Sequence, residues 1–293
     1  MLKNAGTLLK ETLASFIEDD ALSRGASMAF YAVTSLAPIL LIVAAIAGLF
    51  FGEDAARNAL AGQFETLMGH ESAALLQGVI ENAGRKSSGI LATIIGVVTL
   101  LAAASGVFGE MQSALNRIWK VSPRGSTVSR LIRARAASLG LVAALGFLLL
   151  ISLVVSAALS ALGDYVNAYL PFGKLILSAL NAILSFALIS ILFAAIYKVL
   201  PDTRLEWRDV VIGAIATSLL FTIGKSLIGW YLGASAISST YGAAGALIVV
   251  LLWVYYSSQI FLLGAEFTHV YANRRVSRTG GKSAGRSITG QQP

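Results

Sequence analysis

Cysteine is absent from the 293-residue chain, and charge is scarce, since Asp, Glu, Lys and Arg together make up 13% of the residues. The missing thiols exclude disulfides and thiolate chemistry, and they say little about the compartment. Soluble domains carry about 25% charged residues. The low charge, together with a hydrophobic content of 56%, therefore indicates a membrane protein.

Strands with alternating polar and apolar residues are also lacking, whereas uncharged stretches reach the roughly 20 residues that a spanning helix needs. Open sheets cannot cross lipid, because their edges leave backbone groups unpaired. We therefore expect an all-α, polytopic membrane protein with six transmembrane helices in one bundle. The expected spans are about 26–51, 88–109, 137–162, 175–198, 209–232 and 244–270.

The positions of the basic residues give an orientation. Most of the 22 Lys and Arg fall before the first expected span, in the second and fourth loops, and after the last span. Positive charge is retained on the cytoplasmic side in short loops, which predicts that both the N-terminus and the C-terminus are cytoplasmic. The same placement accounts for most of the net charge of +7, so we expect no nucleic-acid partner.

The two ends of the chain differ from the 25–272 membrane domain. Apolar residues recur at helical spacing between Leu2 and Ile17, which predicts an amphipathic helix over residues 2–20 of an N-terminal segment 1–24, lying on the cytoplasmic interface or against the bundle. Acidic residues just before the first span argue against a cleavable signal. Residues 273–293 are rich in Gly, Ser and basic residues, and we expect a disordered basic tail.

Catalytic motifs are missing. The two histidines, His70 and His269, lie at opposite ends of the expected bundle, so they cannot form the His and carboxylate cluster of a metal-dependent nuclease. The chain contains neither a GxxxxGK[ST] phosphate loop nor a GxSxG nucleophile motif. We expect no enzymatic activity, no catalytic residue, no metal and no cofactor.

The last expected span is unusual because Tyr255, Gln259 and Glu266 share one narrow face at 100° per residue. Polar groups in lipid normally face the bundle interior. This stripe either hydrogen-bonds neighbouring helices or lines a hydrated pathway. Glu266 lies about four residues from the expected cytoplasmic end, roughly 6 Å along the helix, so we expect it to be partly hydrated.

Lys225 is the cation left within an expected span. Tyr255, Gln259 and Asn181 are expected at a similar depth, and the alternative is that the lysine extends to the outer surface. The candidates for a substrate pathway are Lys225, Gln259, Tyr255, Asn181 and Tyr31.

At the inner end, Glu110 and Glu266 are expected at comparable depth, with Arg24 and Arg117 as counter-charges. These residues form either a gate or an ordinary interfacial ion pair. Pro38 and Gly242 are the hinge candidates, although a proline kink in a membrane helix is often static.

Three segments carry a family resemblance: "RGASMAFYAVTSLAPILLIV" (24–43), "SALNRIWKV" (113–121) and "TYGAAGALIVVLLWVYYSSQIFLLGAEFTHVYA" (240–272). They resemble the YihY family, also called the BrkB virulence-factor family, of bacterial inner-membrane proteins once mislabelled ribonuclease BN. The resemblance covers about residues 5–275. The matching residues are Tyr31, Ser35, Pro38, Asn116, Tyr241, Gly242, Tyr255, Gln259, Gly264 and Glu266.

The resemblance implies a multi-pass protein of the bacterial cytoplasmic membrane with six helices and cytoplasmic termini. It also implies a role in the cell envelope and transport, with lipids as the suspected cargo, but it supplies no established site. The sequence thus favours a transporter-like protein that moves a lipid or another anionic envelope compound along helices 1, 4, 5 and 6. The alternative is a membrane scaffold or assembly factor, and a nuclease is the weakest hypothesis. The sequence does not identify the oligomeric state.

Overall fold

The protein is described from a computed structural model, which covers residues 2–34, 106–121, 173–234 and 243–287, together with five isolated residues. Within these ranges every regular element is a helix. The labelled helices are α1 (Leu2–Glu18), α7 (Gly173–Val199), α8 (Trp207–Ala234) and α10 (Ala243–Ser287), and residues 21–34 and 106–118 are also helical. The all-α class is therefore confirmed for the described part of the chain.

Three of these helices are long and apolar enough to cross a membrane: Ile176–Val199, Trp207–Tyr231 and Leu247–Arg275. They overlie the last three of the six expected spans, and their composition supports the assignment of the chain as a membrane protein. The expected spans 26–51, 88–109 and 137–162 lie largely or wholly outside the described residues.

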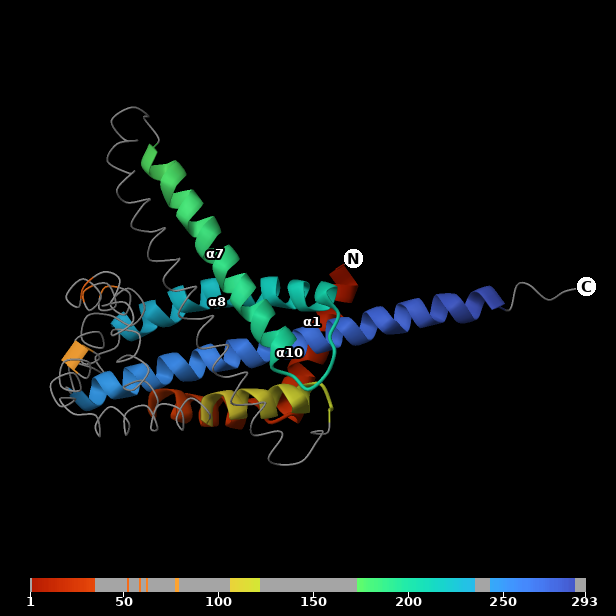
Figure 1. Ribbon diagram of the computed structural model, residues 1–293, viewed down its shortest axis with the longest axis horizontal. Helices are drawn as coiled ribbons and strands as arrows, with labels where there is room; N and C mark the ends of the chain where they lie inside the picture. Colours follow the sequence, from red (N-terminus) through yellow and green to blue (C-terminus); the bar gives the residue numbers. More distant parts are fainter. Residues whose placement is uncertain are drawn as a thin grey trace, which may run out of the picture.

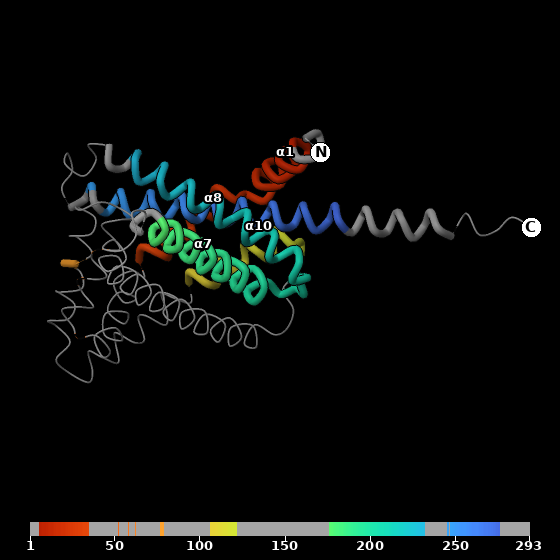
Figure 2. Tube along the Cα trace, turned by 90° about the horizontal axis from the view of Figure 1, so that it is seen from above, coloured from red at the N-terminus to blue at the C-terminus, as the bar shows by residue number. Residues whose placement is uncertain are grey.

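α10 is the central helix of the described part. In Figure 1 it runs between α8 on one side and the helical segments 21–34 and 106–118 on the other. α10 contacts both α8 and α1, and Figure 2 shows α1 crossing α10 obliquely. α7 packs on α8 and diverges from it toward its own N-terminal end (Figure 1).

The contact between α8 and α10 contains two glycines, and a threonine of the opposite helix packs on each of them. Thr268 packs directly on Gly213, and Thr217 packs directly on Gly264, so that a Cβ atom on either glycine would overlap the opposing hydroxyl. Each threonine hydroxyl also donates to the carbonyl of the glycine four residues earlier on its own helix, at 2.7 Å for Thr217 and 2.6 Å for Thr268. Two Gly-x-x-x-Thr segments thus interlock, which brings the helix backbones close together.

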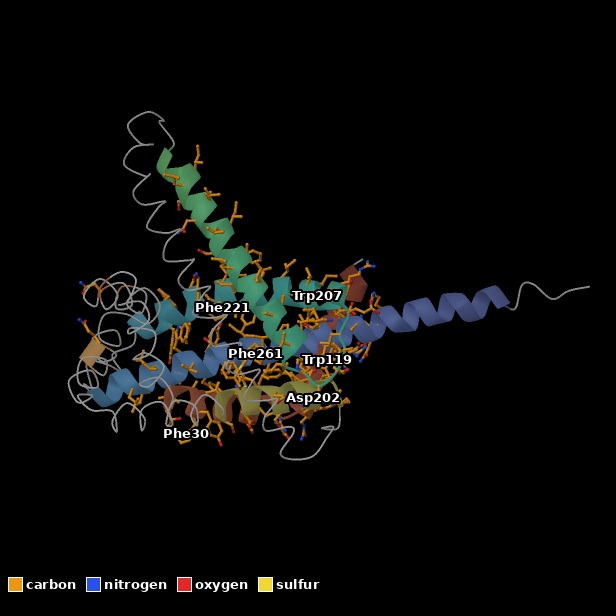
Figure 3. The ribbon with its side chains drawn as sticks, viewed as in Figure 1. Phe30, Trp119, Asp202, Trp207, Phe221 and Phe261 are labelled. Atoms are coloured by element: carbon orange, nitrogen blue, oxygen red, sulfur yellow. The ribbon has the colours of Figure 1, made fainter. Side chains whose placement is uncertain are left out.

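Aromatic rings fill the space beside this contact. Tyr197 is fully buried, and its hydroxyl donates to the carbonyl of Phe261 at 2.7 Å and meets the Thr217 hydroxyl at 3.1 Å. The rings of Phe193, Tyr197 and Phe261 pack against one another, and Figure 3 shows Phe221 and Phe261 between the helices. These contacts tie the C-terminal end of α7 to α8 and α10.

The connection from α7 to α8 is held by the 106–118 helix. Asn116 donates to Oδ2 of Asp202 at 2.9 Å, and its own Oδ1 accepts the backbone N–H of Asp202 at 2.8 Å. Gln112 donates to the other Asp202 oxygen at 3.3 Å. Figure 3 shows Asp202 with Trp119 and Trp207 at one end of the described helices. The side-chain amide of Asn116 therefore binds both the side chain and the backbone of Asp202 in this loop.

The N-terminal helix ends earlier than residue 20, because α1 stops at Glu18 and the chain turns at Asp19 and Asp20 before the next helix begins. Asp20 has a φ of 54°, a left-handed conformation that aspartate tolerates better than most residues. Leu9, Leu13 and Ile17 are exposed, whereas Thr12 is buried. α1 therefore packs on the protein through Thr12 and the partly buried Phe16, and it leaves other apolar side chains outside.

In the C-terminal segment, α10 continues to Ser287, and the expectation of a disordered basic tail over 273–293 stays a prediction. Arg274 pairs with Glu11 at 2.6 Å, and Arg275 pairs with Asp209 at 2.9 Å and with Glu206. These ion pairs fix the helix where a tail was expected to begin. From an anchored helix, each further residue adds a backbone hydrogen bond without a new nucleation step.

Candidate functional site

Two helices end at the same place and bring acidic and basic residues together. α1 ends before Asp19, and the 106–118 helix ends before a turn at Trp119 and Lys120. Lys120, like Asp20, has a left-handed backbone, with a φ of 52°. A lysine in this conformation costs about 1–3 kcal/mol and persists only where its surroundings hold it there, and such strain is common at functional sites.

Asp19 is the buried acid of this junction, with 5% of its surface exposed. The Lys120 amine donates to both of its oxygens, at 2.6 and 2.7 Å, and Nε of Arg117 lies 3.6 Å from Oδ1. Arg117 also reaches the exposed Asp20 at 3.3 Å. Two cations therefore compensate the Asp19 carboxylate.

Glu266 lies against this ion-paired turn and is 0% exposed. Asp19, Lys120 and Glu18 are charged groups that act on its carboxyl group electrostatically. Two carboxylates cannot donate to each other, and neither oxygen of Glu266 has a hydrogen-bond donor among the described residues. The expectation that Glu266 is partly hydrated is wrong, because its side chain is fully buried.

His269 lies one turn further along α10. Its Nε2 meets the Asn273 amide at 2.9 Å, and its ring lies edge-on to Trp119 with 5.1 Å between the ring centres. Nδ1 is buried and has no hydrogen-bond partner in the described part of the chain. The junction thus contains a buried carboxyl group, that of Glu266, and a buried ring nitrogen of His269 that have no hydrogen-bond partner among the described residues.

The four residues expected as gating or counter-ion groups do not form one cluster. Arg24 pairs with Glu110 at 3.5 Å and also reaches the Ser113 hydroxyl at 3.4 Å. Arg117 binds Asp19 and Asp20 instead of Glu266, because the turn after α1 brings these carboxylates to it. Whether any of these residues gates a pathway stays a prediction.

Gln259 lies on the same face of α10 as Glu266 and points to the 21–34 helix. Its amide donates to the carbonyl of Leu22 at 3.3 Å, and it sits directly on Gly25. Tyr255 is partly buried one turn earlier. Tyr31, on the 21–34 helix, packs against Gly106, where an added Cβ atom would lie 2.8 Å from its ring. The polar face of α10 is therefore turned toward the N-terminal part of the chain.

The remaining candidates lie elsewhere. Lys225 is partly buried on α8, and the neighbouring Gly224 packs on Tyr256 and Ile260 of α10, not on Gln259. Asn181 is exposed on the diverging part of α7 (Figure 1). The hinge candidates Pro38 and Gly242 lie outside the described residues. The structure thus brings Gln259 and Glu266 to one side of α10, and Lys225 to the other.

Asp19 and Lys120 were missed as site residues at the level of sequence. The signal was the acidic run Glu18, Asp19 and Asp20 between two apolar helical segments. Such a run at a predicted helix boundary suggests a solvated loop, and nothing local indicates that its middle residue is buried. Only the fold brings it to residues about 100 and 250 positions away.

Comparison with known proteins identifies the family. The sequence profile of the family described as "Virulence factor BrkB" matches residues 12–288. A UPF0761 membrane protein of Mannheimia succiniciproducens is 26% identical over 283 residues, which cover 94% of each chain. The putative ribonuclease-like protein YfkH of Bacillus subtilis is 24% identical, over 92% of this chain and 96% of its own.

A UPF0761 membrane protein of Ralstonia nicotianae is 30% identical over 85% of this chain, and the match covers 55% of that longer protein. No solved structure matches the chain significantly. The profile match spans nearly all of the described residues, including the Asp19, Lys120 and Glu266 junction. The apolar helices and these matches agree with the family resemblance of the sequence segments, and the chain is a membrane protein of the BrkB virulence-factor family.

Proposed function

We propose that the protein is a transporter of the bacterial inner membrane that moves a lipid or another anionic envelope compound. The observation that carries the proposal is Glu266, a fully buried carboxyl group without a hydrogen-bond donor among the described residues of a membrane helix. Burying such a group is costly, and ionisable groups within membrane helices commonly mark ion or substrate pathways.

The proposed topology has six spans with both termini in the cytoplasm. Ion pairs place the part of α10 around Arg274 and Arg275 beside α1 and beside the start of α8, through Arg274 with Glu11 and Arg275 with Asp209. Lys120 and Arg117 meet the end of α1 at the same junction. Basic residues therefore gather at one end of the described helices, as the retention of positive charge on the cytoplasmic side requires.

The proposed cargo is anionic because of Lys225, which is partly buried on a membrane helix. A lysine amine in this position binds a phosphate or carboxylate as a point charge. We propose that Lys225 contacts the charged group of the cargo. Gln259, Tyr255, Tyr31 and Asn181 remain pathway candidates, and Pro38 and Gly242 remain hinge candidates.

The test is movement of a labelled anionic phospholipid across liposomes that contain the purified protein, under a proton gradient. We expect Lys225→Met and Glu266→Gln to lose the movement that the wild type supports. Matched controls are Lys10→Met and Glu206→Gln, because both side chains are exposed, and these variants should move lipid at the wild-type rate. Equal rates for all five proteins, at equal insertion and folding, would contradict the roles of Lys225 and Glu266.

A membrane scaffold is the second candidate, and one observation favours it. Gln259 uses its amide to bind the Leu22 carbonyl, which is what a polar residue does when it joins two helices. A scaffold predicts that Gln259→Leu lowers stability in detergent regardless of any lipid or solute added. Absence of lipid movement by the wild type would favour this function.

Enzymatic activity is not part of the proposal. The name of YfkH includes a likeness to ribonucleases, but this chain has only two histidines, His70 and His269, and no phosphate-binding loop motif. We therefore propose neither a cofactor nor a nucleic-acid partner, and the partner is the lipid bilayer.

A further inference from the structure

We propose that α1 is a membrane-surface helix that inserts one face into the lipid leaflet at which the described spans end. This face, the α1 stripe, consists of Leu9, Leu13 and Ile17, which are 57%, 46% and 70% exposed. Its partner is the boundary between the headgroups and the acyl chains of that leaflet. The inference goes beyond the proposed function and does not use it, since a transporter and a scaffold would both carry this surface.

The three described spans end at one level. The span of α7 ends at Val199, the span of α8 begins at Trp207, and the span of α10 ends at Arg275. Arg275 pairs with Asp209 at the start of α8, and the Lys198 amine lies 5.1 Å from the centre of the Trp207 ring. Trp207 is 61% exposed, and tryptophan is enriched at the interface between membrane and water. The shared end of the spans therefore marks the membrane surface.

α1 lies at this level because an ion pair holds it there. Glu11, in the middle of α1, pairs with Arg274 at 2.6 Å, one residue before the end of the α10 span. α1 crosses the direction of α8 and α10 at the end where α8 begins (Figure 1 and Figure 2). A helix that crosses the spans at their ends lies along the membrane surface, where an amphipathic helix buries its apolar face in lipid.

The faces of α1 fit three different surroundings. With Leu13 at 0° and 100° per residue, the α1 stripe extends from about −40° to about 40°. Thr12 and Phe16, at about −100° and −60°, are buried and partly buried against the protein. Glu11 and Glu18, at about 160° and 140°, are exposed on the side away from the stripe. Protein, lipid and water thus each have a separate face of this helix.

Lipid is the occupant that the depth of the α1 stripe favours. Three large apolar side chains on one face are unfavourable in water, and their burial in an apolar environment is favourable. At the level where spans end, lipid surrounds a membrane protein wherever its own chain does not. The α1 stripe adjoins the face that carries Phe16, so the leaflet meets it directly beside the protein.

The absence of cysteine allows single nitroxide labels to report depth in lipid nanodiscs. Leu13→Cys reports on the α1 stripe, and Glu18→Cys reports on the opposite, exposed side of the same helix. Val199→Cys marks the end of a span, and Ile191→Cys, about 12 Å away along α7, marks the bilayer interior, and both positions are exposed. At each label, accessibility to oxygen, which concentrates in the bilayer, is compared with accessibility to a nickel chelate, which stays in water.

We expect the ratio of oxygen to nickel accessibility at Leu13→Cys to be several-fold higher than at Glu18→Cys. It should be close to the ratio at Val199→Cys and below the ratio at Ile191→Cys. Equal ratios at Leu13→Cys and Glu18→Cys would overturn the proposal, because the stripe would then face water. A label at Leu13→Cys that neither reagent reaches would also overturn it, because protein, such as a second copy of the chain, would then cover the stripe.

Brominated lipids give a second measurement, with a fluorophore in place of the nitroxide. Lipids brominated near the headgroup should quench the fluorophore at Leu13→Cys more than lipids brominated near the chain end, and the order should reverse at Ile191→Cys. Quenching at Leu13→Cys as weak as at Glu18→Cys would contradict insertion of the stripe. Neither measurement uses transport, so this proposal and the lipid-movement assay can fail separately.

Discussion

Thr217 and Thr268 occupy equivalent places on two crossing helices, because each packs on a glycine of the opposite helix and bonds the glycine four residues before it on its own. The same residue pattern on α8 and α10 thus builds both halves of the contact. The glycines permit the approach, and the threonine hydroxyls are satisfied without a partner from the other helix.

Replacement of Gly213 by alanine should destabilise the protein. The new Cβ atom overlaps the Thr268 side chain, and overpacking of this kind costs about 1–3 kcal/mol, of which the better helix propensity of alanine returns up to about 1 kcal/mol. We expect a lower thermal midpoint in detergent. Gly229→Ala is the matched control on the same helix, because nothing lies within 4 Å of its Cβ position, and it should be neutral or slightly stabilising.

Thr268→Ala in the Gly213→Ala background should recover part of the lost stability, because it removes the overlapping hydroxyl and methyl groups. Additive losses in the double variant would show that the two side chains do not meet.

Replacement of Asp202 by alanine should loosen the α7–α8 connection. The variant leaves the Asn116 amide group without its carboxylate, and loss of a part-buried hydrogen bond to a charged group costs about 1.5–3 kcal/mol. Gln112→Ala removes one longer bond, of 3.3 Å, and should cost less. Proteolysis between Val199 and Trp207 is the measurement, and equal protection of both variants would contradict the role of Asp202.

The contact between α1 and α10 should weaken in acid through Glu11. A hydrogen bond from Arg274 holds the pKa of Glu11 below its ordinary value. A lowered pKa in the folded protein means that the ion pair stabilises the contact above the ordinary glutamate range and is lost as the pH falls through the lowered pKa. Glu11→Gln should remove this dependence, as measured with a label at Leu9→Cys on α1. Because Glu11 is exposed, added salt should reduce the effect in the wild type.

Composition and uncharged runs predicted the helical membrane class because both follow directly from the bilayer, which requires long apolar segments with internally paired backbones. The end of α1 was predictable to within two residues, since an acidic run interrupts the apolar periodicity at Glu18. These are local properties, and each can be inferred from a window of about 20 residues.

The surroundings of Glu266 were not predictable in this way. Depth along α10 suggested partial hydration, whereas the residue is fully buried, and one of the charged groups that act on it is Asp19, almost 250 positions earlier. The partner of Arg117 was missed for the same reason. Periodicity gives the face of a helix on which a residue lies, but contact between distant segments decides what meets that face.

The two opposite faces of α10 restrict insertions and deletions within this helix. Gln259 and Glu266 are seven residues apart and lie roughly 20° apart around the helix, whereas Gly264 and Thr268 lie about 160° from Glu266. Gly264 and Thr268 pack on α8. Gln259 donates a hydrogen bond to Leu22 of the N-terminal segment, and Asp19 of the same segment acts electrostatically on Glu266. Inserting or deleting one residue between Gln259 and Gly264 would rotate Gln259 by about 100° relative to Gly264, Glu266 and Thr268. Relatives can therefore exchange individual side chains along α10, but the number of residues between these positions has to stay the same.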